Sequence, residues 1–571
     1  MGEGHGPSHC LATAAIILAM PWRRSKVLIG LLAIVPAAAE EGSSPVAIAI
    51  SVMLMGSIGF QMLMFYLVNW PDRDIQRYSW QVISQTISIF CAVLLFQGCN
   101  GLVEEHFIKG STPPVEVAVD MCQMLFWLTC MQIVLAITSG ALSEYFGAEP
   151  DQEKVELNVK SWSVLFSHVA GFATINAWGS IQQEYFNGSF LQALLVIPIG
   201  YCGLSIIYHF FDVVREHVAH MDDDKKDWYE EKWDEETEEA ENDVAGLSLS
   251  FLTVQALRYA ISGILPNQEG IESWSDAISH SSRQCHLLMG CGLVFFLLSL
   301  AVLNFSERLS EEQSKRMERA IEILNNYFTF GLSWSLFYGV RWQLSALRFT
   351  DENALLMVSI ALFLSVASFL MIFVLDKVED NHLFGQDSEV AEGATEKMIS
   401  GLGILIGFSW EQSFDTAVDV VAEGLREDCP PLISKMIMSV ILVLIVFPAW
   451  RIYILPMEME LSEEMTEEGA QKAVLKQYAQ QHFDLFLEKE RNEDDLDRAH
   501  LLMKRHRRTA HGLQHPGHGV PSGLKHLMVT SSGIEEVDAP EEHHRHEKHG
   551  EKKKRRNAGH QRENAKPLLS N

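Results

Sequence analysis

The chain has 571 residues, of which 48% are hydrophobic, and its formal net charge is −30. These averages alone would also suit a soluble acidic protein. However, apolar runs of about 20 residues alternate with charged loops, which is typical of a polytopic membrane protein. The composition therefore predicts an all-α protein that crosses a lipid bilayer several times, with no nucleic-acid partner.

The first 39 residues resemble a signal peptide. Basic residues at 23, 24 and 26 precede a short apolar core over residues 27–35, and an A-x-A pattern predicts cleavage after Ala39. An uncleaved first anchor is the alternative interpretation. A cleaved signal would insert the protein through the secretory pathway, into the plasma membrane or an endomembrane, with its mature N-terminus outside.

Residues 40–456 form the predicted transmembrane domain, with about eleven spans. They lie near 46–69, 81–103, 117–142, 163–183, 190–214, 245–265, 285–305, 321–344, 353–375, 398–422 and 432–455. An odd number of spans places the C-terminus in the cytoplasm. The positions of basic loop residues agree with this orientation, because positively charged loops favour the cytoplasmic side. Asn187, in the sequon Asn187-Gly188-Ser189, would then face outward as a possible glycosylation site.

Five stretches of the chain look like copies of one helix hairpin. A similar nine-residue run begins at Gly171, Gly331 and Gly407, and weaker copies begin at Ile89 and Phe251. The copies recur about every 80 residues, the length of two spans with their loops. The corresponding two-helix repeats lie near 79–150, 160–216, 244–306, 320–377 and 396–456. Duplicated hairpins produce pseudo-symmetric assemblies of the kind found in transporters.

Polarity alternates between the two helices of each repeat. The spans that carry the nine-residue run contain Ser, Thr, Gln, Asn and Trp, whereas the spans between them are nearly pure apolar. This alternation predicts an inner set of parallel polar helices and an outer set that faces lipid. Accordingly, Trp178, Trp334 and Trp410 should be less exposed to lipid than Phe296 and Phe369.

Three segments are predicted to lie outside the membrane. Residues 216–243 are rich in Asp and Glu and predict a solvated, partly helical cytoplasmic loop, with a docking site for a basic partner or divalent cation as the alternative. Residues 457–503 predict a cytoplasmic helix. Residues 504–571 are basic and His-rich and predict a disordered tail, whose polybasic run suits anionic lipid headgroups.

The candidate site is an acidic stripe in the tenth span. Glu411, Asp415 and Asp419 follow one another at intervals of four residues, which places neighbours on the same helical face. Ionisable groups at that depth usually face a cavity or a partner, so the stripe predicts a path for cations or protons. A helix face that is simply in contact with water is the alternative. Arg258 and Arg341 are the expected counter-charges, unless they extend to the membrane interface.

The favoured function is a transporter or channel-like protein. A non-transporting scaffold or receptor that acts through its acidic loop and tail is the main alternative, and a membrane enzyme ranks third. The chain contains no HExxH, GxSxG, Walker A or kinase signature, so no enzymatic activity, metal or cofactor is predicted.

Overall fold

The computed structural model describes residues 45–142, 151–220, 226–308, 315–347, 353–380, 388–427 and 429–462, and the residue pairs 529–530 and 533–534. The predicted signal segment with its cleavage point after Ala39 lies outside the described residues. So do most of the predicted helix 457–503 and of the tail 504–571. The chain divides into two units, Met1–Glu467 and Glu468–Asn571. In the second unit, the strands β1 (Val529–Thr530) and β2 (Gly533–Ile534) pair in antiparallel register.

The first unit is helical, and the residues described there include eleven helices of 19 residues or more. They are α2 (Pro45–Val68), α3 (Arg73–Val103), α4 (Pro113–Thr138), α6 (Gln152–Tyr185), α7 (Phe190–Ala219), α8 (Trp228–Ser262), α10 (Ser282–Arg308), α11 (Lys315–Ala346), α12 (Asn353–Asp380), α13 (Ser388–Gly424) and α14 (Pro431–Ala449). The π-turn η1 (Glu104–Ile108) extends α3, and η2 (Trp450–Ile454) extends α14 in a helix that reaches Ser462. A single short helix, α9 (Trp274–Ala277), precedes α10 among the described residues.

Each long helix overlaps one of the segments expected from the sequence. Eight of them are long and apolar enough to cross a membrane; α6, α11 and α13 are more polar and do not meet that criterion. Local signals set several helix ends. Asp227 forms a capping box with Glu230 at the start of α8, and Gly263, at φ +80°, ends the same helix in the left-handed conformation.

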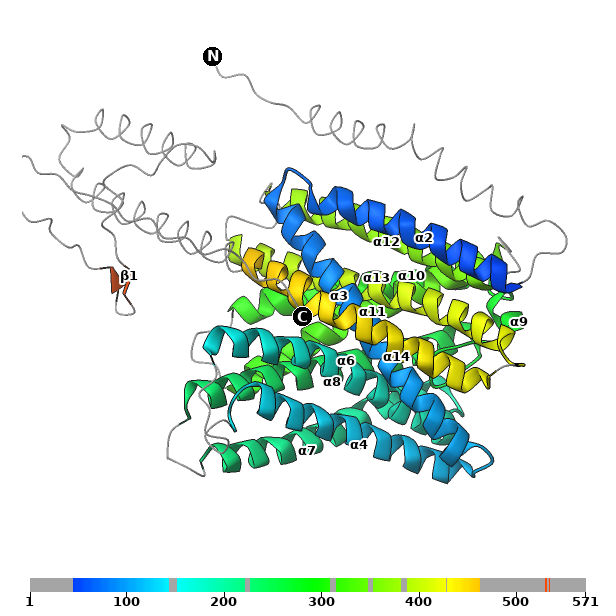
Figure 1. Cartoon of the computed structure of the whole chain (residues 1–571), viewed down its shortest axis with the longest axis horizontal. Helices are drawn as coiled ribbons and strands as arrows, with labels where there is room; N and C mark the ends of the chain where they lie inside the picture. Colours follow the sequence, from blue (N-terminus) through cyan, green and yellow to red (C-terminus); the bar gives the residue numbers. More distant parts are fainter. Residues whose placement is uncertain are drawn as a thin grey trace, which may run out of the picture. The chain divides into compact units, whose positions relative to one another are not determined.

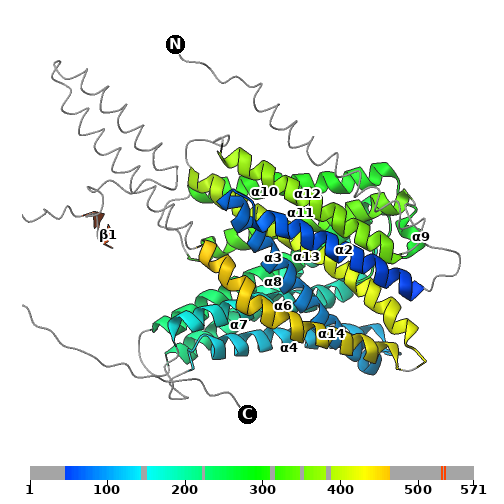
Figure 2. The same cartoon turned by 45° about the horizontal axis from the view of Figure 1, so that its top comes forward.

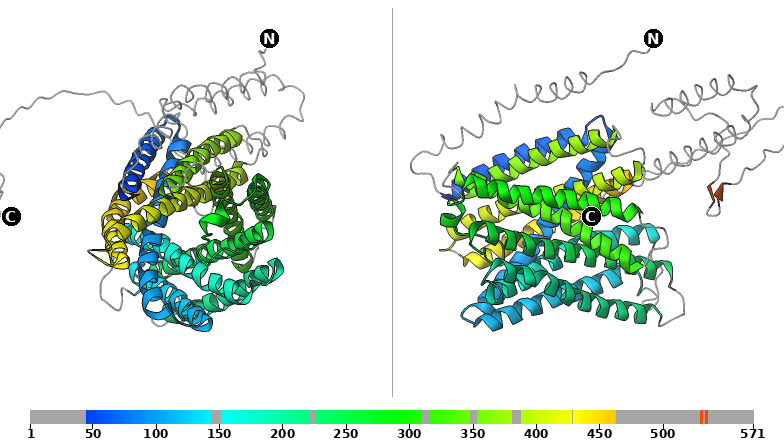
Figure 3. Two further views of the ribbon diagram at one scale, coloured as in Figure 1. Left: turned by 90° about the vertical axis from the view of Figure 1, so that its right-hand side faces the viewer. Right: turned by 180° about the vertical axis from the view of Figure 1, so that it is seen from behind.

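Five helices form a closed ring. α3 packs on α6, α6 on α8, α8 on α11 and α11 on α13, and α13 packs back on α3. The left panel of Figure 3 views these helices nearly end-on. The ring helices are the five whose sequences carry the copies of the nine-residue run. The three helices that are too polar to qualify as spans on their own all belong to this ring, where neighbouring helices surround them.

The other helices form an outer layer. α4 packs on α6, α7 on α8, α10 on α11, α12 on α13 and α14 on α3, so each outer helix covers the next inner helix around the ring. This packing pattern occurs five times. α2 stands outside it and packs on α12, α13 and α3; Figures 1 and 2 show it beside α12. The ring closes through chain segments far apart in sequence, since Gln85 Nε2 of α3 donates to Ser400 Oγ of α13 at 2.8 Å.

Exposed apolar side chains gather on the outer layer. α2, α4, α7, α10, α12 and α14 all present them along their length, for example Phe126, Phe210 and Leu444. On the inner helices, most of the described side chains of this kind lie near the helix ends, for example Tyr185 and Leu425. An apolar surface of this extent on the outer helices has the chemistry of a surface that contacts lipid.

The tryptophans of the nine-residue runs are buried. Trp334 is 1% exposed, and Trp178 and Trp410 are each 7% exposed. Phe369 does not follow its prediction, because it is only 3% exposed. One turn later on the same face of α12, Phe373 packs edge-on against Trp70, so the chain that follows α2 covers this part of the outer layer.

The glycine that opens each clear copy of the run lies at a helix contact. A Cβ on Gly171 would meet the Leu247 side chain at 2.7 Å, and one on Gly407 would meet the Thr86 backbone at 3.0 Å. A Cβ on Gly331 would meet the Phe295 ring at 3.1 Å. The recurring glycine therefore marks a position where a ring helix approaches a neighbour closely, as small residues do in membrane bundles.

The acidic segment 216–243 is less solvated than the sequence indicates, because its second half forms the start of α8. Glu241 is 0% exposed and binds three other helices. It accepts hydrogen bonds from Gln132 of α4 at 2.7 Å, from Arg215 of α7 at 2.9 Å and from Arg319 of α11 at 2.6 Å. Charged residues in this segment therefore tie the inner and outer layers together at one end of the ring.

Candidate functional site

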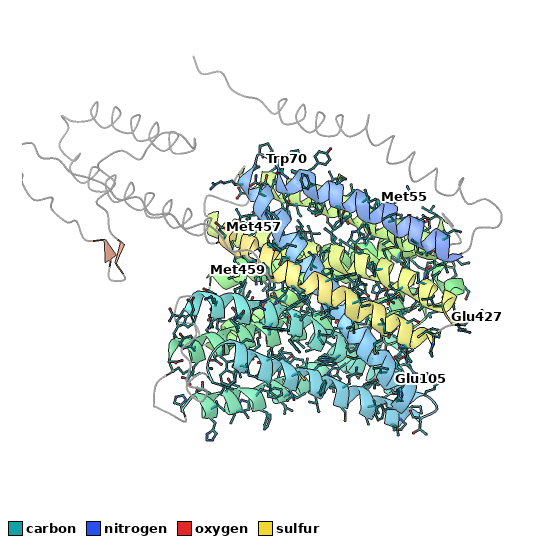
Figure 4. All side chains as sticks on the ribbon, in the orientation of Figure 1. Met55, Trp70, Glu105, Glu427, Met457 and Met459 are labelled. Atoms are coloured by element: carbon teal, nitrogen blue, oxygen red, sulfur yellow. The ribbon has the colours of Figure 1, made fainter. Side chains whose placement is uncertain are left out.

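A cavity of about 310 Å³ lies at the other end of the ring. The C-terminal halves of α3, α6, α8 and α13 line it, together with the start of α14 and the loop 263–273 that follows α8. Because the C-terminal halves of four ring helices meet there, these helices run in the same direction. Figure 4 agrees: Glu105 and Glu427, which follow α3 and α13, lie at one end of the bundle, and Trp70 and Met457 lie at the other.

Aromatic rings separate the cavity from the opposite end of the ring. Phe172, Phe251 and Phe408 line its inner side. Phe172 stacks on Phe408 with centroids 6.3 Å apart, and Trp334 and Phe337 pack edge-on against Phe408 at 4.6 and 4.8 Å. On α8, Glu241 and Phe251 are ten residues apart, or about 15 Å along the axis. Glu241 and its partners Gln132, Arg215 and Arg319 form the Glu241 cluster. The cavity and this cluster are therefore distinct polar regions with an apolar layer between them.

The wall of the cavity is strongly acidic. The described residues that line it include four carboxylates, Glu104, Glu269, Asp415 and Asp419, but Lys435 as the single cationic side chain. The Lys435 ammonium lies 2.8 Å from an oxygen of Asp415 and 2.8 Å from an oxygen of Asp419. A more open depression of about 820 Å³ shares Asp419 and Lys435 with the cavity, so this ion pair forms part of both walls.

The predicted acidic stripe is divided between the cavity and the protein interior. Asp415 and Asp419 line the cavity, whereas Glu411 is 0% exposed and does not. One oxygen of Glu411 accepts a hydrogen bond from Gln412 at 3.0 Å, and the other has no hydrogen-bond partner among the described residues. The stripe is therefore partly buried rather than uniformly in contact with water.

The counter-charge of the stripe differs from the expected one. Within the described part of the chain, neither Arg258 nor Arg341 forms an ion pair with the stripe, and Lys435 of α14 does so instead. Arg258 is 1% exposed and binds Glu272 at 2.5 Å. The reason is the path of the loop 263–273, which folds back against α8 and brings its own carboxylate to the arginine.

This loop is held by a buried polar cluster. Besides Arg258, Glu272 accepts hydrogen bonds from His280 at 3.0 Å and from the Trp342 indole at 2.9 Å. Burial alone would raise the pKa of Glu272, but the His280 hydrogen bond and the Arg258 charge outweigh it and lower the pKa to about 2. Glu272 therefore stays ionised at neutral pH and anchors the loop.

Backbone contacts complete the anchor. Arg258 also donates to the Gly270 carbonyl at 3.0 Å, and Gly270 has a φ of +79°. A Cβ at Gly270 would collide with the Tyr338 hydroxyl. Glycine is thus required there for both its conformation and its size. The anchored loop presents Gln268 and Glu269 to the cavity.

Glu269 is the loop carboxylate that lines the cavity. Its enclosure by protein, together with the negative charges of Glu104 and Asp415, raises its pKa to about 7, although the Lys435 charge opposes this. A carboxyl group with this pKa can gain and lose a proton near neutrality, as a proton carrier or a pH-sensitive cation ligand requires.

No protein-family model, curated protein sequence or solved structure matches this chain. The site must therefore be interpreted from its own chemistry. That chemistry is anionic and enclosed, and it includes one carboxyl group, Glu269, whose pKa is raised to about 7.

A second carboxylate region lies behind the wall. Asp120 of α4 is 1% exposed and accepts hydrogen bonds from Ser180 and, at 3.0 Å, from Asn176, both on α6. Asn176 also lines the cavity. Sequence patterns gave no reason to select Glu104, Glu269 or Asn176, because they lie on a helix extension, a loop and a helix that are far apart in sequence.

Three further carboxylates gather near the start of α3. Oxygens of Asp72, Asp74 and Asp376 lie within 4.8 Å of one another. Asp72 caps the helix by accepting a hydrogen bond from the Asp74 backbone at 3.2 Å, which accounts for the closeness of the first two.

Proposed function

We propose that the protein is a multi-pass membrane transporter or channel-like protein that moves cations or protons through the ring of inner helices. The observation that supports this most directly is the cavity, whose four carboxylates face one another with a single lysine. Enclosing like charges in this way is costly unless a cation or proton compensates them, so such a site selects positive charge.

The apolar layer of Phe172, Phe251 and Phe408 supports a gated pathway rather than an open pore. It lies between the acidic cavity and the Glu241 cluster, where a passing ion would have to displace aromatic side chains. We propose that the helix contacts at the recurring glycines allow small movements of the ring helices that open this layer. Hydrophobic constrictions commonly gate membrane pathways.

The proposed orientation places the cavity on the outer side. If the chain is inserted through the secretory pathway with its mature N-terminus outside, α2 runs inward and α3 outward. The C-terminal ends of the ring helices then face outward, as does Asn187. The Glu241 cluster and the basic C-terminal tail face the cytoplasm, where the tail can contact anionic lipids. Epitope tags at the exposed turn 187–189 and after Asn571, probed on intact cells, test this orientation.

Flux measurements test the function itself. The purified full chain is reconstituted into liposomes, and proton and cation fluxes are followed under an imposed membrane potential. Glu104→Gln should lower the flux, whereas its matched control Glu105→Gln should not, because Glu105 is exposed and paired with Lys109 at 2.7 Å. Glu411→Gln should lower the flux or shift its pH dependence.

Two outcomes would oppose the proposal. If the folded protein carries no proton or cation flux, the scaffold or receptor function becomes the better account. If both Glu104→Gln and Glu411→Gln leave a measurable flux unchanged, ions cross the protein by a path other than this cavity.

A further inference from the structure

Several acceptors that line the cavity have no hydrogen-bond donor among the described residues. Asn176 is 3% exposed, lines the cavity, and its side-chain oxygen accepts no hydrogen bond from any described residue. The same holds for the side-chain oxygen of Gln97, another lining residue. Among the described residues, Glu269 forms no ion pair, and the Glu104 side chain accepts a hydrogen bond from Asn100 alone, at 2.9 Å. Unpaired buried acceptors cost free energy, so this wall is suited to a ligand that carries several donors.

One cationic group of the protein itself, the Lys435 ammonium, already binds to the cavity wall. The Lys435 side chain is a primary alkylammonium, and two carboxylates bind its Nζ atom at 2.8 Å each. This arrangement satisfies Asp415 and Asp419, whereas the other acceptors, Glu104, Glu269 and Asn176, have no ammonium or guanidinium partner at ion-pair distance among the described residues.

The apolar part of the lining favours an organic ligand over a metal ion. Phe96, Phe172, Phe251 and Phe408 contribute aromatic rings to the cavity. Rings attract ammonium groups and cover alkyl chains, whereas hard metal cations prefer six or more oxygen ligands. A volume of about 310 Å³ also exceeds that of a bare ion and is at the lower limit for small-molecule pockets.

We infer that this cavity binds a small primary alkylammonium ion, with the ammonium group among Glu104, Glu269 and Asn176 and the alkyl group against the phenylalanine rings. This inference rests on the proposed cation pathway, since the same cavity serves both. It specifies the class of cation: one positive charge, at least three N–H donors and a short apolar chain.

The test uses n-propylammonium chloride, titrated into the purified full chain in detergent micelles at pH 8 and followed by calorimetry. Saturable binding is expected, with little or no heat from sodium chloride, potassium chloride or the neutral analogue 1-propanol. Glu104→Gln and Glu269→Gln should each weaken binding at least tenfold, and Glu105→Gln should leave it unchanged. Phe172→Leu should weaken binding but leave its dependence on Glu269 intact.

Each result that differs from these expectations has a different consequence for the two proposals. Binding of sodium or potassium without propylammonium would overturn the inference but would leave cation transport standing. Propylammonium binding that survives both Glu104→Gln and Glu269→Gln would overturn it as well, because the ligand would then bind elsewhere. Propylammonium binding at this site without any flux in liposomes would instead refute the transport proposal alone. If Glu104→Gln fails to fold, Glu269→Gln, in the loop, still decides the result.

Discussion

Replacing Arg258 with methionine should lower the free energy of unfolding by about 3–5 kcal/mol, the usual cost of removing one partner from a buried ion pair. His280 and Arg258 together lower the pKa of Glu272 from 4.5 to about 2, which corresponds to a stabilisation of about 3 kcal/mol at neutral pH that the two partners share. Because Arg258 and Glu272 are 1% and 3% exposed at their side chains, water weakens this interaction little.

The sign of the pH dependence follows from the same group. The folded-state pKa of Glu272 is depressed, so its stabilisation is fully present above about pH 4.5 and is lost as the pH falls towards 2. The assay is unfolding in mixed micelles of increasing SDS content, at several pH values. In Arg258→Met, the unfolding free energy should fall at pH 7 and should depend less on pH between 5 and 3.

The matched control is the double variant Arg258→Met with Glu272→Gln. It should recover part of the loss, because no unpaired carboxylate then stays buried. A loss below about 1 kcal/mol in the single variant would refute the reasoning, since it would mean that the loop 263–273 is not held by this ion pair.

Three further predictions use the same unfolding and flux assays. Lys435→Met should lower the free energy of unfolding by only about 1–2 kcal/mol, less than the loss of a buried pair, because Asp419 is 56% exposed. Adding Asp415→Asn should recover part of this loss, and no recovery would argue against the pairing. Cation flux should rise as the pH increases from 6 to 8, because Glu269, with its pKa near 7, loses its proton over this range and gains a negative charge. A Glu269→Gln variant with the same pH profile would show that Glu269 is not the group that titrates. Gly270→Ala should destabilise by more than Gly263→Ala, because both have positive φ but a Cβ collides only at Gly270; equal effects would show that the Tyr338 contact relaxes freely.

Helix positions could be predicted from the sequence because apolar length is a local property. Each predicted segment overlaps one long helix, and the alternation of polarity indicated which helices are surrounded by others. The same argument did not identify the burial of Phe369 on α12, a helix that also packs on α2, roughly 300 residues earlier in the chain. Apolar side chains identify candidates for burial, but only the fold determines which of them are covered.

The candidate site was predicted only in part. Asp415 and Asp419 were selected because their four-residue spacing, visible in the sequence, places them on the same face of one helix. Lys435 and Glu269 were not assigned to the site, since their roles depend on how α14 and the loop 263–273 pack against α13. Arg258 was assigned to the wrong cluster of charges, because nothing in the local sequence shows that this loop folds back and provides Glu272.

The packing of the last helix on α3 has a consequence for how the protein is made. Ser84 of α3 and its partner Trp450, in the extension of α14, are 366 residues apart. At typical synthesis rates of 5–20 residues per second, about 20–70 s separate the appearance of these two residues. If the chain is inserted into a membrane as proposed, α3 lacks both α13 and α14 during that interval. Its polar face must be shielded in some other way, by early neighbours or by a membrane chaperone. Nascent chains that stall before residue 450 should therefore be recognised as incomplete by the cell's quality control.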